Sequence, residues 1–131
     1  MAELKEGRAR NWTFLVYPES APNNWRDILD EEHIQWVESP LHDKDTNADG
    51  MLKKSHWHIL LLFDEEKGFE QVRRVTNMVN ATIPQICVSV KGLVRYMAHM
   101  NNLKKVQYDK NLIVGHGGVD VTGYLKPVSY Y

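Results

Sequence analysis

The chain has almost no cysteine and no long apolar run, and both shortages limit what it can be. Its only cysteine, Cys87, has no partner for a disulfide, so a secreted domain held together by disulfide bonds is excluded. No apolar run approaches the ~20 residues that a membrane-spanning helix needs, and no secretory signal opens the chain. We therefore expect a reducing, cytoplasmic setting.

A charge excess of either sign is also missing. The 131 residues include 16 basic and 17 acidic side chains, so overall charge does not indicate nucleic-acid binding. A hydrophobic share of 43% is typical of a globular domain, and no repeat or linker divides the chain, so we expect a single domain over residues 1–131. Basic residues do gather in three pairs, which would suit either a phosphate backbone or ordinary solvated surface. These pairs are Lys53–Lys54, Arg73–Arg74 and Lys104–Lys105.

Hydrophobic periodicity predicts alternating strands and helices. Strands are expected at 11–18, 34–39, 55–63 and 84–90, and helices within 19–33, at 69–80 and at 92–100. The last of these strands would place Ile86, Val88 and Val90 on one face, and 106–118 is a candidate for a further strand or hairpin edge. The order is the split β-α-β arrangement of ferredoxin-like and RRM-like domains. We therefore predict an α+β fold, an antiparallel sheet with helices packed on one face.

Two histidines open the third predicted strand, in SHWHILLLF at 55–63. Because side chains alternate along a strand, His56 and His58 point to the same face. Such a pair can bind one metal ion, but it can also be polar decoration at the end of a strand.

The segment PLHDKD at 40–45 favours metal binding, because strands joined by one loop usually lie side by side. His42 and Asp45 would then join the two strand histidines as ligands. Asp43 is an alternative ligand or an outer partner of an imidazole, and both aspartates are also typical turn caps. Mixed nitrogen and oxygen ligands suit Mn²⁺, Zn²⁺, Co²⁺ or Ni²⁺, whereas Mg²⁺ prefers more oxygen.

A candidate nucleophile lies in VRYMAHM at 94–100. Tyr96 and His99 are three residues apart on a predicted helix and would be neighbours on one face. Arg95 would contact a phosphate or belong to the helix surface. A tyrosine with its free pKa of about 10 needs help to attack phosphorus, and without other context a half-buried structural tyrosine is the simpler interpretation.

These segments, together with WTFLVYPES at 12–20 and QYDK at 107–110, resemble the ordered motifs of RepB-type rolling-circle plasmid replication initiators. Those proteins belong to the His-hydrophobe-His endonuclease superfamily, and the resemblance runs from about Trp12 to Tyr108. It implies a metal-dependent, origin-specific DNA nickase that forms a 5′-phosphotyrosine intermediate.

Carried over residue by residue, the resemblance makes Tyr96 the nucleophile and leaves the role of His99 open. It implies a site for Mn²⁺ or Mg²⁺ whose ligands are His42, Asp45, His56 and His58. The expected partner is the double-strand origin of a plasmid, single-stranded or extruded as a hairpin at the nick. The expected DNA contacts are the three basic pairs and Arg95. Relatives carry a C-terminal oligomerisation domain that we expect this chain to lack, so an oligomer is expected only with that domain.

Three other functions stay open at this point. A metal-dependent phosphoesterase would use bound water, with Tyr96 only packing. A non-catalytic nucleic-acid module would use the same fold as RNA-binding domains, which stack bases on sheet aromatics. A viral or mobilisation nickase would share the chemistry and differ in its biology.

Overall fold

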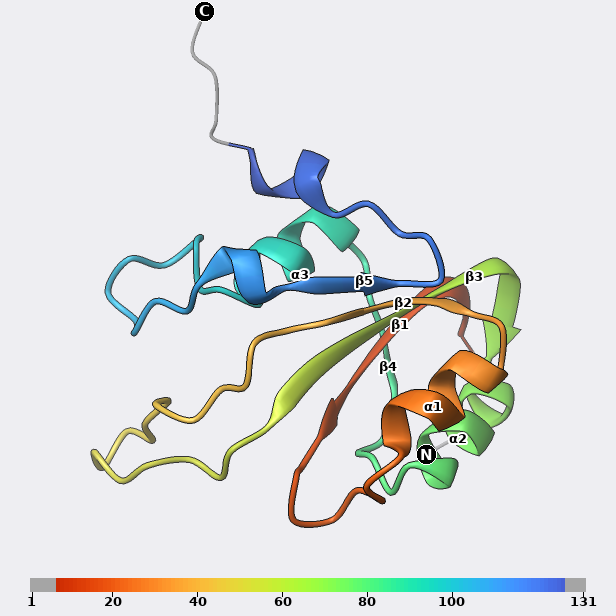
Figure 1. Ribbon diagram of the computed structural model, residues 1–131, viewed down its shortest axis with the longest axis horizontal. Coiled ribbons are helices and arrows are strands. Elements are labelled where there is room, and N and C mark those ends of the chain that lie inside the picture. The colour runs from red at the N-terminus through yellow and green to blue at the C-terminus, as the bar shows by residue number, and fades with distance from the viewer. Residues whose placement is uncertain (1–6, 127–131) are drawn as a thin grey trace, which may run out of the picture.

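The computed structural model describes residues 7–126, which form a five-stranded antiparallel sheet with three α-helices (Figure 1). The strands are β1 (Arg8–Val16), β2 (Gln35–Glu38), β3 (Trp57–Gly68), β4 (Gln85–Ile86) and β5 (Val114–His116). Their order across the sheet is β4-β1-β3-β2-β5, and each neighbouring pair is antiparallel. The first four strands follow the split β-α-β order, and β5 extends the sheet beside β2. The predicted α+β class is confirmed.

The α-helices are α1 (Trp25–Glu31), α2 (Phe69–Met78) and α3 (Val90–Tyr96), and two short 3-10 helices follow, η2 (Lys110–Leu112) and η3 (Thr122–Leu125). In the part of the chain described, no helix has both the length and the apolar character needed to cross a membrane.

The helices cover both faces of the sheet, so the expectation that they pack on one face is correct for α1 and α2 and wrong for α3. Trp36, Ile59 and Leu61 pack in the core under α1 and α2. Their strand neighbours Val37 and Leu60 pack in a second core formed with α3. Figure 1 shows α3 on the side of the sheet opposite to α1 and α2. Because central strands are apolar on both faces, each face needs a cover.

The fourth predicted strand is much shorter than expected. β4 ends at Ile86, and Val88 is 96% exposed instead of sharing a buried face with its neighbours. The Ser89 hydroxyl accepts a hydrogen bond of 3.0 Å from the Gly92 amide, which caps the start of α3. Helix therefore begins within the segment that was predicted as strand.

Other element boundaries in the structure also differ from those predicted from the sequence. The chain leaves α3 after Tyr96, three residues before His99, whose φ of +58° lies in the left-handed region. β3 continues through the charged residues 64–67, and its last two residues, Lys67 and Gly68, pair with Ala9 and Arg8 of β1. The predicted strand or hairpin at 106–118 contains η2 and β5. The pattern of residues 123–131 predicts no particular element; η3 covers the start of this segment, and residues 127–131 lie outside the described part.

Candidate metal site and nucleophile

Pairing between β2 and β3 continues beyond the end of β2 and carries His42 into the sheet. The Ser39 amide donates to the His58 carbonyl at 3.0 Å, and the His58 amide donates to the Ser39 hydroxyl at 2.8 Å. Further along, His42 and His56 form an isolated antiparallel bridge with N–O distances of 2.8 and 3.2 Å. Residues opposite each other in an antiparallel pair share a face. His42 therefore lies on the α3 face, together with His56 and His58.

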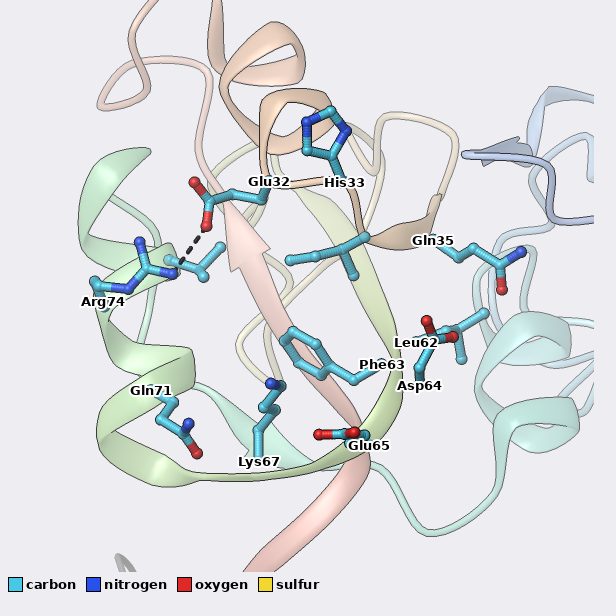
Figure 2. Close-up of a pocket in the computed structure, with 12 residues that line it drawn as sticks. Glu32, His33, Gln35, Leu62, Phe63, Asp64, Glu65, Lys67, Gln71 and Arg74 are labelled. Atoms are coloured by element: carbon cyan, nitrogen blue, oxygen red, sulfur yellow. Dashed lines mark hydrogen bonds and ion pairs between the residues drawn. The ribbon is translucent and has the colours of Figure 1, made fainter.

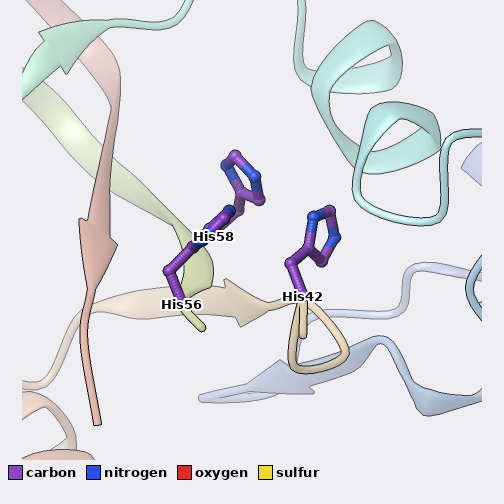
Figure 3. A group of neighbouring side chains, drawn as sticks. All are labelled: His42, His56 and His58. Carbon is purple, nitrogen blue, oxygen red and sulfur yellow. The ribbon is translucent and has the colours of Figure 1, made fainter. Parts of the chain in front are cut away.

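The imidazoles of His42, His56 and His58 form one cluster (Figure 3). Each offers a ring nitrogen, and these atoms all lie within 4.8 Å of one another. The ring centroids are 4.6 Å apart for His42 and His58, and 5.1 Å apart for His56 and His58. The three histidines that the sequence suggested as metal ligands are thus neighbours in space.

Asp45 is the carboxylate that reaches this cluster. Its Oδ2 lies 3.1 Å from Nδ1 of His42 and 3.7 Å from Nε2 of His56. The Asp43 side chain is exposed to solvent. Of the two aspartates that the sequence offered, the geometry favours Asp45.

The pKa values of three groups in this site, His58, His42 and Asp45, are shifted by their surroundings. Burial lowers the pKa of His58 to about 3, helped by its histidine neighbours. Burial also lowers the pKa of His42, against the opposing effects of the Met97 carbonyl and Asp45. Burial alone would raise the pKa of Asp45, but hydrogen bonds with Tyr108 and His42 outweigh it and lower that pKa. At neutral pH His58 is therefore an uncharged imidazole, and Asp45 is an ionised carboxylate.

Three imidazoles and one carboxylate fit a divalent metal ion, since this donor set suits Mn²⁺ and the later first-row ions. His42 is fully buried, and both of its ring nitrogens have protein partners. Its Nδ1 contacts Asp45, and its Nε2 lies 2.6 Å from the Met97 carbonyl oxygen. Metal binding through His42 would therefore replace one of these two contacts.

Tyr96, the last residue of α3, lies against the histidine cluster. Its ring meets the His58 ring edge-on, with centroids 5.3 Å apart and an interplanar angle of 90°. The Nζ atom of Lys105 lies 5.1 Å from the Tyr96 ring centroid. Tyr96, His58 and Arg73 also border a groove of about 740 Å³. The candidate nucleophile and one candidate ligand, His58, therefore border one cleft.

His99 is buried beside both groups. Its ring centroid lies 5.2 Å from that of Tyr96 and 4.9 Å from that of His42. Its Nδ1 lies 2.8 Å from the Val106 carbonyl oxygen, which can only accept, so Nδ1 carries the proton. Within residues 7–126 its buried Nε2 has no hydrogen-bond partner, and His99 forms a second possible ligand group with His42 and Asp45.

Sequence reasoning missed Tyr108 as a residue of this site. Its ring stacks on His42, with centroids 4.2 Å apart and an interplanar angle of 15°. Its hydroxyl donates to Oδ1 of Asp45 at 2.5 Å and accepts from the Lys44 amide at 3.0 Å. Burial, followed by the bond to Asp45, raises the pKa of Tyr108, so the phenol stays protonated. The only sequence signal for Tyr108 was its position in the QYDK segment of the family resemblance. No spacing rule connects Tyr108 to Asp45.

The four lysines expected to contact DNA lie in two loops that connect residues of the site, one from Asp45 to His56 and one from His99 to Tyr108. Lys53 and Lys54 end the polar loop that leads to His56, and Lys54 forms an ion pair of 2.5 Å with Glu19. Lys104 and Lys105 lie in the exposed turn that follows His99.

The predicted arginine contacts separate from one another. Arg73 borders the groove beside Tyr96, but Arg74 points to a hollow of about 530 Å³ elsewhere, where it forms an ion pair of 2.9 Å with Glu32 (Figure 2). Arg95 donates to the carbonyl oxygens of Tyr124 and Lys126 at 3.2 and 3.0 Å. Arg74 and Arg95 are therefore engaged within the protein, and neither is brought to the histidine cluster.

Fold and site together define an α+β domain with a histidine-rich site that suits a divalent metal, next to a tyrosine. Comparison with known proteins gives the family. Residues 4–122 match the family described as plasmid replication protein, origin binding domain. The chain belongs to this family.

Three curated relatives extend this result. A replication protein from Staphylococcus aureus is 53% identical over 122 residues, which cover 93% of this chain and 61% of the relative. Replication protein RepB from Lactiplantibacillus plantarum is 48% identical over 118 residues, or 90% of this chain and 53% of the relative. Replication protein RepB from Streptococcus agalactiae is 30% identical over 132 residues, which cover 93% of this chain and 63% of the relative. The chain thus spans between 53% and 63% of the length of these relatives.

Proposed function

We propose that this chain is the origin-binding and nicking domain of a rolling-circle plasmid replication initiator. It would bind the double-strand origin and cleave one strand there, single-stranded or extruded as a hairpin, as a His-hydrophobe-His endonuclease. The observation that carries this proposal is the edge-on contact of Tyr96 with His58, with ring centroids 5.3 Å apart. Family membership supports plasmid DNA as the substrate.

In the proposed reaction, the Tyr96 oxygen attacks the scissile phosphorus in line. The phenol loses its proton, the bond from phosphorus to the 3′-oxygen breaks, and that oxygen takes up a proton. The products are a 5′-phosphotyrosyl link and a free 3′-hydroxyl that can prime synthesis. One phosphodiester replaces another, so the reverse reaction can rejoin a strand without an energy cofactor.

The other residues of the cleft would prepare this step. Mn²⁺ or Mg²⁺, held by His42, Asp45, His56 and His58, would supply Lewis-acid polarisation of a phosphoryl oxygen. Lys105, whose Nζ lies beside the Tyr96 ring, would attract the phosphate. His99 presents an unpartnered Nε2 in the same space, where it would hold a ligand or a water in place.

Oligomer formation is proposed to depend on parts of the longer relatives that this chain does not span. Binding of the domain to duplex DNA should weaken steeply as salt rises, because phosphate contacts release counterions.

The direct test mixes the protein with Mn²⁺ and a supercoiled plasmid that carries its cognate origin. We expect relaxed circles and a covalent protein–DNA adduct that survives denaturation, and both should disappear with a chelator. The Tyr96→Phe variant should keep metal and DNA binding while losing the adduct. Tyr124→Phe, which removes a hydroxyl from η3, is the matched control and should behave like the wild type.

The alternatives give different results. Nicking without an adduct, retained in Tyr96→Phe, would indicate a phosphoesterase that uses water. Origin binding without any cleavage would indicate a non-catalytic module. Either result would overturn Tyr96 as the nucleophile.

A further inference from the structure

Two loops that connect residues of the candidate site carry the same three residues, Leu-Lys-Lys, at 52–54 and at 103–105. The leucine of each is largely exposed: Leu52 at 67% and Leu103 at 82%. In Figure 1 the two loops, yellow and light blue, extend from the same end of the molecule. A single exposed leucine is ordinary, but two that each precede a lysine pair beside one site call for an explanation.

The first loop is a preformed hairpin. Thr46 and Leu52 form an antiparallel bridge, and the Asn47 amide donates to the Met51 carbonyl at 2.8 Å. Gly50 has a φ of +85°, which the tight turn at its tip requires. Leu52 is therefore displayed by a structured loop, so its ordering adds little entropic cost on binding.

The second loop is held by the Gln107 side chain. Its Nε2 lies 2.9 Å from the His99 carbonyl oxygen, 3.1 Å from that of Asn102 and 3.0 Å from that of Lys105. The Lys104 amide donates to Oδ1 of Asn102 at 3.1 Å. Leu103 lies between these anchored residues and is displayed in a fixed turn.

Both loops begin and end in the site itself. The hairpin leads from Asp45 to His56, and the second loop leads from His99 to Tyr108. The hydrogen bond between Tyr108 and Asp45 joins the bases of the two loops. In addition, Lys105 places its ammonium group over the Tyr96 ring.

We infer that the two Leu-Lys-Lys tips form a DNA-opening surface, in which the lysines bind phosphates and the leucines press against bases and unstack them next to the cleavage site. The inference rests on the proposed DNA substrate. Apolar side chains of architectural DNA-binding proteins wedge between base steps in this way, and lysine neighbours would hold the backbone while the step opens. The lysine pair beside each leucine favours DNA over an apolar protein partner. Unstacking would give Tyr96 access to a phosphate that a paired strand holds away from it.

The test compares a double variant, Leu52→Ser with Leu103→Ser, with a control double variant, Val88→Ser with Leu112→Ser. Val88 and Leu112 are 96% and 58% exposed, and neither precedes a lysine pair. The probe is a hairpin oligonucleotide from the origin of the encoding plasmid, with 2-aminopurine at the nick position. Fluorescence of this base rises when it unstacks, and the measurement is made without metal so that no cleavage is needed.

We expect wild type and control to raise the fluorescence, and the Leu52/Leu103 variant to lose most of the rise. With Mn²⁺, that variant should nick a single-stranded oligonucleotide within ~2-fold of the wild-type rate and the paired hairpin at least ~10-fold more slowly. The inference would be overturned if the Leu52/Leu103 variant and the control variant raised the fluorescence equally. It would also be overturned if the Leu52/Leu103 variant lost the same fraction of its nicking rate on single-stranded and on paired DNA. If the wild type unstacks the probe but never cleaves it, the proposed nickase fails while the opening surface stands.

Discussion

The Tyr108 hydroxyl donates a hydrogen bond of 2.5 Å to Oδ1 of Asp45, whose other oxygen faces the imidazoles of His42 and His56. Tyr108 also stacks on His42 and accepts a hydrogen bond from the Lys44 amide. This one side chain therefore fixes the orientation of the carboxylate and the plane of an imidazole. Partners of this kind strongly affect metal affinity in other proteins.

The Tyr108→Phe variant should bind Mn²⁺ about tenfold more weakly than the wild type, because phenylalanine keeps the stack on His42 but leaves Asp45 free to rotate. Titration calorimetry measures the affinity, and the visible spectrum of the Co²⁺-loaded protein should change with the coordination. The thermal midpoint in chelator serves as the check on folding. An unchanged affinity and spectrum would remove Tyr108 from the site, and loss of the DNA adduct with normal metal binding would make Tyr108 the better nucleophile.

Asp45 and Asp43 give a matched pair of substitutions two residues apart. Asp45→Asn should lower Mn²⁺ affinity by at least about tenfold, because the carboxylate beside His42 and His56 loses its charge. Asp43→Asn should leave the affinity within ~2-fold, since Asp43 is exposed to solvent. The reverse ranking would show that the loop rearranges on binding metal and that Asp43 is the ligand.

Sequence reasoning could predict the histidine cluster because it depends on local rules. Alternation placed His56 and His58 on one face, and the single loop that joins the two strands placed His42 beside them. The same rules gave the antiparallel sheet and its split β-α-β order. Each step needed only the strand period and the usual adjacency of connected strands.

The features that sequence reasoning missed depend on tertiary structure. Helical spacing predicted an amphipathic α3 but contains no information on which face of the sheet it covers. The Ser89 cap started that helix within an apolar run whose pattern also suited a strand. Tyr108 reaches Asp45 only after a 63-residue separation is closed by the fold. From sequence alone, Arg95 and Arg74 resemble cations that are free to bind DNA. The fold pairs Arg95 with the Tyr124 carbonyl and Arg74 with the Glu32 carboxylate.

On the opposite face of the sheet, buried Glu38 joins α1 to β2 and β5. Its carboxylate accepts hydrogen bonds from Arg26 at 2.7 to 3.0 Å and lies 2.8 Å from Nε2 of His116. Glu38→Gln should lower the free energy of unfolding by about 2 kcal/mol, since it leaves the partly exposed Arg26 without its charged partner. Urea unfolding measures this change, and Mn²⁺ affinity should not change.

The comparison for Glu38→Gln is Glu32→Gln, which breaks the exposed ion pair between Arg74 and Glu32. Exposed pairs contribute little, so this variant should lose less than ~1 kcal/mol. Equal losses from the two substitutions would show that burial gives the Glu38 network no added stability.

Burial raises the pKa of the Cys87 thiol above its ordinary value of 9.0, although a hydrogen bond with the Ser89 backbone opposes this. The thiolate is the reactive form, so alkylation of the native protein should be slow at pH 8 and should still rise roughly tenfold per pH unit through pH 9. In urea, the exposed thiol should be alkylated faster than in the native protein, and its alkylation rate should level off at a lower pH than the rate of the native protein.

The same shift predicts how stability depends on pH. A raised pKa means that the folded chain holds the thiol proton more tightly, so its contribution is complete below pH 9 and is lost as pH rises through the folded pKa. Wild type should therefore lose stability more steeply than Cys87→Ala between pH 8 and 10, as measured by urea unfolding. Because Val94 and Met97 of the α3 core pack in the same cluster as Cys87, parallel stability curves would mean that this core admits water to the thiol.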